Sequence, residues 1–354
     1  MTAPFRVAFS GDFRRADGSF AYPMIDLSPL TDDPAIEVSF VPPVEGRMRA
    51  EDLAEHDALV LLAPRFDHAS IPRNGRLGLV ARLGVGYDTV EVPALTEAGI
   101  ALVTTPDGVR RPVAVSVVTL LLALSQHLLI KDRLTRQGPE GWAERARFMG
   151  IGLVGRTFGQ LGLGNIGAEV IRLLAPFGMR LIAHDPFVDA TAATALGVTM
   201  VDEETLFRES DFLSICVPLS PATHHFVNAR RLALMKPTSF LINTARGPVV
   251  DEAALIAALR EGRIAGAGLD VFEMEPSPVD NPLFAMQNVI VAPHALCWTD
   301  QCFAGNGAVD VAACLAVMRG EVPKGLLNRE VADHPAFRDR LSRNSARFSA
   351  IRRE

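Results

Sequence analysis

Residues 157–185 read TFGQLGLGNIGAEVIRLLAPFGMRLIAHD, and the fold of the chain follows from this stretch. The apolar run at 158–161 predicts a short buried strand, and the apolar spacing of residues 168–177 is typical of an amphipathic helix. A second apolar run at 180–184 predicts the next strand, which ends at Asp185. A strand, a glycine-rich turn, a helix and a strand in this order predict a βαβ unit in a parallel sheet.

The turn of this unit is GLGNIG (162–167), a GxGxxG element in which each glycine has a physical role. Gly162 permits a tight turn out of the strand, and Gly164 lets a pyrophosphate approach the backbone. Gly167 lets the following helix pack closely on the sheet, and the helix N-terminus offers N–H groups to the phosphates. The residues expected to bind a dinucleotide are Gly162, Gly164, Asn165, Ile166 and Gly167. An ordinary strand–turn–helix without a ligand is the alternative.

Asp185 indicates which dinucleotide the unit takes. It lies 18 residues after the last glycine of the turn, where its carboxylate can accept hydrogen bonds from both hydroxyls of an adenosine ribose. A 2′-phosphate would be repelled there, and residues 186–190 (PFVDA) contain no arginine that could receive one. The sequence therefore predicts NAD (NADH) and not NADP as the cofactor.

Length and composition narrow the class of protein. A chain of 354 residues, of which 49% are hydrophobic, can form two domains with a core each. A net charge of −6 gives no sign of a nucleic-acid-binding surface. The four cysteines form no CxxC pair and no cysteine–histidine spacing typical of zinc, so we expect no metal site and a reduced, cytoplasmic protein. The apolar run at the N-terminus is too short for a signal peptide.

Residues 113–130 (VAVSVVTLLLALSQHLLI) carry no formal charge over 18 positions, which is close to the lower limit for a membrane-spanning helix. Polar residues interrupt the stretch, and the sequence shows no second span. We therefore expect a helix that is buried on all sides, between domains or between subunits, and no membrane anchor. Because this helix has more apolar surface than one domain needs, it also predicts a homodimer.

Strands and helices alternate along the rest of the chain. Strands are expected at 5–10, 58–62, 79–83, 100–104, 212–217, 239–243, 266–271 and 289–292, and helices at 91–98, 255–259 and 302–319. This alternation predicts parallel sheets covered by helices. The expected fold class is α/β with two Rossmann-like, doubly wound domains, namely a flavodoxin-like substrate domain and an NAD-binding Rossmann domain.

Two chain crossings separate these domains. We expect residues 1–112 and 297–331 to form the substrate domain and residues 113–296 the NAD-binding domain. Residues 105–112 (TPDGVRRP) have the composition of a linker. Ligands of open α/β sheets bind at the carboxyl ends of the strands, so the cleft between the domains is the expected active site.

The last 23 residues, 332–354, form a basic tail with six arginines and three acids. Phe337, Leu341, Phe348 and Ile351 lie near one face of a helix predicted in this tail. A surface helix that is partly disordered and a helix that packs on a partner subunit are the two alternatives.

Three polar residues, Arg246, Glu275 and His294, follow predicted strands in the second half of the NAD-binding domain. A guanidinium can hold a carboxylate by two parallel hydrogen bonds. An imidazole can exchange a proton with a hydroxyl or carbonyl oxygen near neutral pH, and a carboxylate beside it fixes its tautomer. Together with a nicotinamide, these groups predict reversible oxidation of a 2-hydroxy acid to a 2-keto acid, although each residue alone is ambiguous.

Ordered motifs over roughly residues 5–331 resemble the D-isomer-specific 2-hydroxyacid dehydrogenases. These motifs are GVGYD (84–88), LGLGNIG (161–167), VPLSPAT (217–223), NTARG (243–247), VDEAAL (250–255), LDVF (269–272), Glu275-Pro276 and Pro293-His294. The resemblance implies an NAD-dependent oxidoreductase, a 2-ketoacid reductase, that acts on a small 2-hydroxy or 2-keto acid as a homodimer.

The resemblance also implies a role for each matching residue. His294 would be the acid/base and Glu275 its partner, while Arg246 would orient the substrate carboxylate and polarise the carbonyl group. Backbone N–H groups around Val85 and Gly86 would bind the same carboxylate from the other domain. The expected cofactor contacts are Asp270, with the nicotinamide carboxamide, and Val217, Pro218, Thr223, Thr244 and Ala245.

Departures from the family pattern leave the substrate open. Ala295-Leu296 replaces the usual Ile-Gly after Pro-His, and Trp298, which follows, could narrow the substrate pocket or fill a hinge. Glyoxylate, hydroxypyruvate, phosphoglycerate and larger acids are all candidates, in either direction of the reaction. A non-catalytic NAD(H)-sensing protein of the same fold, similar to transcriptional corepressors, is the alternative function.

Overall fold

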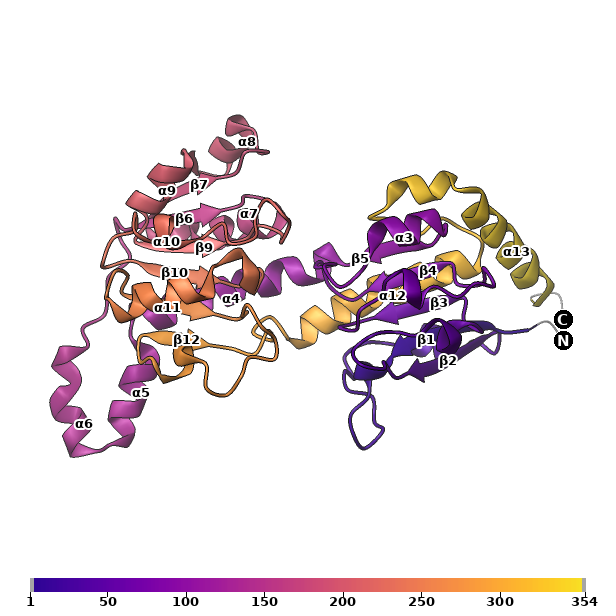
Figure 1. The fold of residues 1–354 in the computed structure, drawn as a ribbon, viewed down its shortest axis with the longest axis horizontal. Coiled ribbons are helices and arrows are strands. Elements are labelled where there is room, and N and C mark those ends of the chain that lie inside the picture. The colour runs from indigo at the N-terminus through magenta and orange to yellow at the C-terminus, as the bar shows by residue number, and fades with distance from the viewer. Residues whose placement is uncertain (1–2, 352–354) are drawn as a thin grey trace. The chain divides into compact units, whose positions relative to one another are not determined.

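The computed structural model describes residues 3–351 of the chain. It consists of two compact units (Figure 1). The first unit comprises Met1–Val109 and Thr299–Glu354, and the second comprises Arg110–Trp298. The domain boundaries predicted from the sequence lie within three residues of these limits, except that the predicted tail belongs to the first unit.

The first unit is built on a five-stranded parallel sheet in the order β2-β1-β3-β4-β5 (Figure 1). Its strands are β1 (Phe5–Ser10), β2 (Ile36–Val41), β3 (Ala58–Leu61), β4 (Leu79–Arg82) and β5 (Ala101–Thr104). The inner strand β3 is buried at every residue, because a parallel sheet is covered on both faces. The sequence prediction missed β2, an edge strand whose apolar run is interrupted by Glu37 and Ser39.

The second unit contains a seven-stranded parallel sheet in the order β12-β11-β10-β9-β6-β7-β8. Its strands are β6 (Thr157–Leu161), β7 (Arg180–His184), β8 (Thr199–Met200), β9 (Phe212–Ile215), β10 (Phe240–Asn243), β11 (Gly266–Leu269) and β12 (Val289–Val291). The chain runs from β6 to β7 on one side and returns to β9 on the other. The strand order therefore reverses between β6 and β9, and such a switch point is where open α/β sheets bind ligands.

Helices connect the strands in both units. They are α1 (Ser28–Thr31), α2 (Ala50–Leu53), α3 (Val92–Glu97), α4 (Pro106–Ser125), α5 (Leu128–Arg136), α6 (Pro139–Glu144), α7 (Asn165–Leu174), α8 (Ala190–Ala195), α9 (Glu203–Glu209), α10 (Ala229–Leu232), α11 (Glu252–Arg260), α12 (Asp300–Met318) and α13 (Pro335–Ile351). Five of them begin after a side chain that accepts a hydrogen bond from the first turn, which sets their starting points. These capping residues are Asp189, Asp202, Asn228, Asp251 and Thr299.

The predicted linker at 105–112 is wrong, because α4 already begins at Pro106. Proline suits the first turn of a helix, whose N–H groups lack intrahelical partners. Gly108 serves packing, since a Cβ at this position would lie 2.7 Å from the backbone nitrogen of Asn306 in α12. The proline at 106 thus starts a helix, and the glycine at 108 lets α12 pack closely against it. Neither residue indicates a flexible connection.

The helix predicted at 113–130 ends early, at Ser125. His127 has a φ of +49°, in the left-handed region that ends a helix, and α5 begins at Leu128. A second candidate span was not expected from the sequence, but α4 and α12 are both long and apolar enough to cross a membrane. In the structure, 50% and 61% of their apolar windows are buried. Each contributes side chains to the core of a unit, which accounts for its composition.

The C-terminal helix α13 packs on its own unit. Phe337 is fully buried in the core of the first unit, Leu341 is 7% exposed, and Phe348 packs against the same core. Ile351, the fourth residue of the expected apolar face, has a side chain that the structure does not describe. The tail is therefore neither a loosely attached surface helix nor dependent on a partner for the burial of Phe337.

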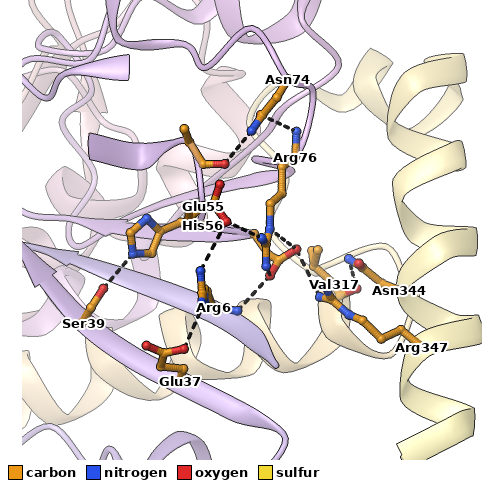
Figure 2. A network of polar contacts seen from close by, with 12 residues as sticks. Arg6, Glu37, Ser39, Glu55, His56, Asn74, Arg76, Val317, Asn344 and Arg347 are labelled. Carbon is orange, nitrogen blue, oxygen red and sulfur yellow. Dashed lines mark hydrogen bonds and ion pairs between the residues drawn. The ribbon is translucent and has the colours of Figure 1, made fainter. Parts of the chain in front are cut away.

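Arginine side chains join α13 to the first sheet. Arg347 forms an ion pair with Asp57 (3.1 Å), a buried carboxylate that also accepts hydrogen bonds from the Arg6 N–H (2.8 Å) and from Arg76 (3.0 Å). Figure 2 shows these three arginines within one network of polar contacts. Arg340, 6% exposed, donates hydrogen bonds to the carbonyl groups of three residues. These are Gly75, Ala98 and Gly99.

We expect Arg340→Ala to lower the thermal unfolding midpoint by several degrees. Three carbonyl groups would lose a charged donor, which costs roughly 2–3 kcal/mol of folding free energy, or roughly 5–10 °C for a unit of this size. Differential scanning calorimetry measures the shift. Arg338→Ala is the matched control, because the Arg338 side chain is 64% exposed and its loss should change the midpoint little. Equal midpoints for Arg340→Ala and the control would contradict the role of Arg340.

Candidate active site

The glycine turn after β6 leaves its backbone open on one side. Gly162 has a φ of +87°, and a Cβ there would lie 2.8 Å from the Cys216 carbonyl oxygen. A Cβ at Gly167 would lie 2.2 Å from the Gly162 carbonyl oxygen, so α7 approaches the turn too closely for a side chain. Beside Gly164 the space is open, since no atom of the described residues is found within 4 Å of a Cβ built there. A phosphate group can therefore approach the backbone at Gly164.

The first turn of α7 is available to an anion. Its N-cap residue is Gly164, which has no side chain to accept hydrogen bonds from the N–H groups of Asn165, Ile166 and the next residues. Asp185 at the end of β7 holds the turn in place, because Oδ2 accepts a hydrogen bond from the Leu163 N–H (2.8 Å). Each carboxylate oxygen has a second lone pair that can accept a ribose hydroxyl. Sequence reasoning missed this positioning contact.

The segments after β9 and β10 carry the other residues expected at the cofactor: Val217, Pro218, Thr223, Thr244 and Ala245. The Thr223 hydroxyl closes its own loop, donating to the Pro218 carbonyl (2.6 Å) and accepting from the Ser220 N–H (2.8 Å). The Thr244 hydroxyl oxygen is buried without a hydrogen-bond partner among the described residues. Since buried polar groups are almost always paired, this hydroxyl and the open backbone at Gly164 fit a polar ligand such as a dinucleotide.

Arg246 follows β10 in a turn that Asn243 shapes. The Asn243 side chain accepts from the Ala245 N–H (3.0 Å) and donates to the Arg246 carbonyl (3.0 Å). Arg246 Nη1 in turn donates to the Ala245 carbonyl (2.7 Å). Glycine is needed at 247, because a Cβ there would lie 1.7 Å from the Phe272 carbonyl oxygen. Sequence reasoning had used Asn243 and Gly247 only as parts of a motif, and the structure shows that they shape the turn.

Glu275 and His294 lie together in the second unit. The Oε2 atom of Glu275 is 2.6 Å from Nδ1 of His294, and Oε1 accepts a hydrogen bond from the Phe272 N–H (2.9 Å). A carboxylate can only accept, so Nδ1 carries the proton and Nε2 is left for a ligand. The side chain of His294 is 43% exposed and can therefore be reached by a small molecule.

The surroundings of Glu275 keep its carboxylate ionised. Burial alone would raise the pKa of this carboxyl group. The hydrogen bonds from His294 and from the Phe272 N–H, together with the electrostatic effects of His294 and Arg246, outweigh burial and lower the pKa below its ordinary value. Arg246 is thus close enough to act electrostatically on the same carboxylate that holds His294.

The turn that carries His294 is held by Asp270. The His294 N–H donates to the Asp270 carbonyl (2.7 Å), and the Asp270 carboxylate accepts from the N–H groups of Ala295 and Leu296 (both 3.1 Å). His294 has a φ of +54°, a conformation that costs energy in a residue with a side chain and needs such support. Burial raises the pKa of Asp270. Asp270 is 3% exposed and its carboxylate holds this turn, while the nicotinamide contact that the family resemblance implies for it stays a prediction.

Val85 and Gly86 belong to the first unit, in the turn after β4. The Gly84 N–H donates to the Thr105 hydroxyl (2.7 Å), and the Thr105 N–H donates to the Gly84 carbonyl (2.9 Å). Gly84 has a φ of +119°, which a residue with a side chain rarely adopts. The turn is thus fixed within its own unit.

Trp298 is the last residue of the second unit, and it is 48% exposed.

Comparisons with known proteins show to which family the chain is similar. Residues 118–295 match the NAD-binding domain of the D-isomer specific 2-hydroxyacid dehydrogenases. A glyoxylate reductase of Korarchaeum cryptofilum is 39% identical over 291 residues, which are 82% of this chain and 88% of the relative. A D-3-phosphoglycerate dehydrogenase of Methanocaldococcus jannaschii is 37% identical over 280 residues, which are 78% of this chain and 53% of that protein.

A solved structure shows the same fold. The TT0316 protein from Thermus thermophilus has a TM-score of 0.79 and 30% sequence identity, and the match covers 91% of this chain and all of the other. The family match, the sequence identity and the shared fold agree with one another. The chain belongs to the D-isomer specific 2-hydroxyacid dehydrogenases, the family of oxidoreductases that bind a nicotinamide cofactor and interconvert hydroxy and keto acids.

Proposed function

We propose that the protein is an NAD-dependent D-2-hydroxyacid dehydrogenase that works as a 2-ketoacid reductase, with His294 as its acid/base. The observation that carries this proposal is the 2.6 Å contact between Glu275 and Nδ1 of His294. It fixes the tautomer that leaves Nε2 for the substrate oxygen, and the charge of Glu275 stabilises the imidazolium that forms when Nε2 takes up a proton.

Each proposed catalytic residue has its own role in the reaction. His294 donates a proton from Nε2 to the carbonyl oxygen during reduction and accepts it during oxidation. Arg246 holds the substrate carboxylate by two hydrogen bonds and polarises the carbonyl group. NADH, when bound, supplies the hydride.

The cofactor would be held by the residues around the switch point of the second sheet. The α7 N-terminus and the open backbone at Gly164 suit the pyrophosphate, and Thr244 offers its buried hydroxyl. Asp185 suits an unphosphorylated ribose, because a 2′-phosphate would lie against its carboxylate. NAD is therefore the proposed cofactor.

We expect Asp185→Ser to lower the preference for NADH over NADPH roughly tenfold or more, since removing one charge repulsion of about 1.4 kcal/mol changes a ratio tenfold. The ratio of kcat/KM for the two cofactors measures this preference. Serine also loses the hydrogen bond to the Leu163 N–H, so Asp185→Asn is the matched variant that keeps an acceptor and removes the charge. A wild-type enzyme that already prefers NADPH would refute the role of Asp185.

Substrate choice is tested with a panel of keto acids. Two relatives are described as a glyoxylate reductase and a D-3-phosphoglycerate dehydrogenase, so we propose a small 2-keto acid such as glyoxylate or hydroxypyruvate. The loss of reduced-nicotinamide absorbance is followed with glyoxylate, hydroxypyruvate, pyruvate, phenylpyruvate and phosphohydroxypyruvate. Turnover of one of them supports the enzyme. NADH binding without turnover of any of them would favour an NAD(H) sensor.

We also propose that two copies of the chain associate. Leu128 and Leu129 of α5 are 55% and 45% exposed, and Trp142 of α6 is 64% exposed. Val115 and Leu122 of α4 add further apolar surface. Large exposed apolar side chains on three successive helices of one unit are typical of a surface that a partner covers. Light scattering of the purified chain measures the mass that distinguishes a dimer from a monomer.

A further inference from the structure

Two imidazoles and a carboxylate lie close together in the second unit, and none of them belongs to the residues proposed for catalysis or cofactor binding. His224 and His225 follow β9 in the chain, and Glu273 follows β11. Nε2 of His225 lies 2.6 Å from Oε1 of Glu273, and the two imidazole rings stack with their centroids 4.0 Å apart. One ligand atom from each residue lies within 4.8 Å of the others, and this is the one such group of three found among the described residues.

Backbone contacts hold all three residues in place. The His224 N–H donates to the Ser220 carbonyl (2.9 Å), and the His225 N–H donates to the Pro248 carbonyl (2.8 Å). His225 has a φ of +49°, and the rings of the two adjacent histidines stack on one another. These contacts fix the backbone that carries the two imidazoles.

Glu273 is tied down in the same way by Glu252, at the start of α11. The Glu273 N–H donates to a carboxylate oxygen of Glu252 (2.9 Å), and the Glu252 N–H donates to Oε2 of Glu273 (3.1 Å). Oε1 is left to face His225. A metal ligand usually has supporting hydrogen bonds of this kind, and a metal ion would take the place of the proton that Oε1 of Glu273 and Nε2 of His225 now share.

We propose that His224, His225 and Glu273 form a binding site for a transition-metal dication of the zinc class. Imidazole nitrogens suit Zn²⁺, Ni²⁺ and Cu²⁺, and three protein ligands with a water in the fourth position complete a tetrahedral zinc centre. Ligand atoms around zinc are roughly 3.4 Å apart for bonds of about 2.1 Å. Partly exposed side chains can reach this spacing from their present positions by small rotations.

A metal at this site would join two segments that belong to the proposed active site. His224 directly follows Thr223 in the segment after β9, and Glu273 lies two residues before Glu275 in the segment after β11. Coordination would tie these segments together across β10, which lies between β9 and β11 in the sheet. The site itself is separate from the proton-transfer pair and does not depend on the proposed reaction.

Titration of Zn²⁺ into the tag-free, EDTA-treated and dialysed full chain, followed by isothermal calorimetry, tests this inference. We expect binding of one equivalent that weakens at least ~10-fold in His224→Ala and in Glu273→Gln, because loss of a ligand should exceed the 10- to 100-fold cost of losing a supporting contact. The matched control is His68→Ala. His68 forms an exposed ion pair with Glu91 (3.1 Å) and should not affect the affinity.

Two further readouts separate this site from adventitious binding by cysteine. Co²⁺ bound in place of Zn²⁺ should show no sulfur-to-cobalt charge-transfer band, since the proposed ligands are nitrogen and oxygen. Zn²⁺ should raise the thermal unfolding midpoint of the wild type but not of His224→Ala, because a ligand of the native state stabilises it. Absence of Zn²⁺ binding, equal affinity in the wild type and His224→Ala, or a sulfur band would each overturn the proposal.

Discussion

Replacement of His294 by alanine is expected to reduce turnover at least ~100-fold while NADH still binds. A positioned acid/base contributes about 10²- to 10⁴-fold to a rate, and alanine leaves no group that can exchange a proton with the substrate oxygen. The imidazole lies outside the glycine turn that would bind the cofactor, so NADH binding, measured by fluorescence, should change little.

His68→Ala is the matched control for this variant, because it also removes a histidine paired with a glutamate, but in the first unit. It should keep wild-type turnover. Glu275→Gln should also lower turnover, since the charge that stabilises the imidazolium is lost and the amide NH₂ must face either Nδ1 of His294 or the Phe272 N–H. Wild-type turnover in His294→Ala would refute the proposed acid/base.

Arg246→Ala is expected to lower kcat/KM by about 10²- to 10³-fold. Truncating one partner of a buried, hydrogen-bonded charge pair costs roughly 2–5 kcal/mol, and the keto acid would lose both its clamp and the polarisation of its carbonyl group. Steady-state kinetics separate the two losses, since weaker binding raises KM and weaker polarisation lowers kcat.

Arg246→Lys distinguishes charge from geometry. Lysine restores the positive charge but not the two parallel hydrogen bonds of a guanidinium, so it should recover only part of the loss. Arg208→Ala, on the exposed face of α9, removes a guanidinium that is paired with Glu204 and should leave kinetics unchanged. Full recovery with lysine would show that a carboxylate clamp is not the function of Arg246.

Much of the fold could be predicted because it depends on local properties of the chain. The apolar runs of β1 and β7 have the predicted limits, Phe5–Ser10 and Arg180–His184, since strands buried on both faces need such runs. The prediction of two Rossmann-like domains is confirmed by the two parallel sheets and by the solved relatives. The edge strand β2 was missed because its residues are only partly buried.

The predictions for two segments were wrong because contacts with distant parts of the chain determine their structure. Residues 105–112 look like a linker, but Gly108 lies against Asn306 and the segment is helical. The tail looks like a surface helix, but Arg340 finds its carbonyl partners 241 to 265 residues away in the chain. Neither Asn306 nor the carbonyl partners of Arg340 lie in the stretch of sequence that forms the helix concerned.

The same division holds for the site. The sequence by itself determined the glycine turn, the acid after β7 and the three candidate catalytic residues, because each follows from the chemistry of one residue type at one spacing. Only the tertiary structure decided that Glu275 meets His294, that Asp270 holds the turn of His294, and that Glu273 meets His225 across 48 residues. Parallel strands bring their carboxyl ends to one edge of a sheet, and which ends become neighbours depends on the strand order of the folded chain.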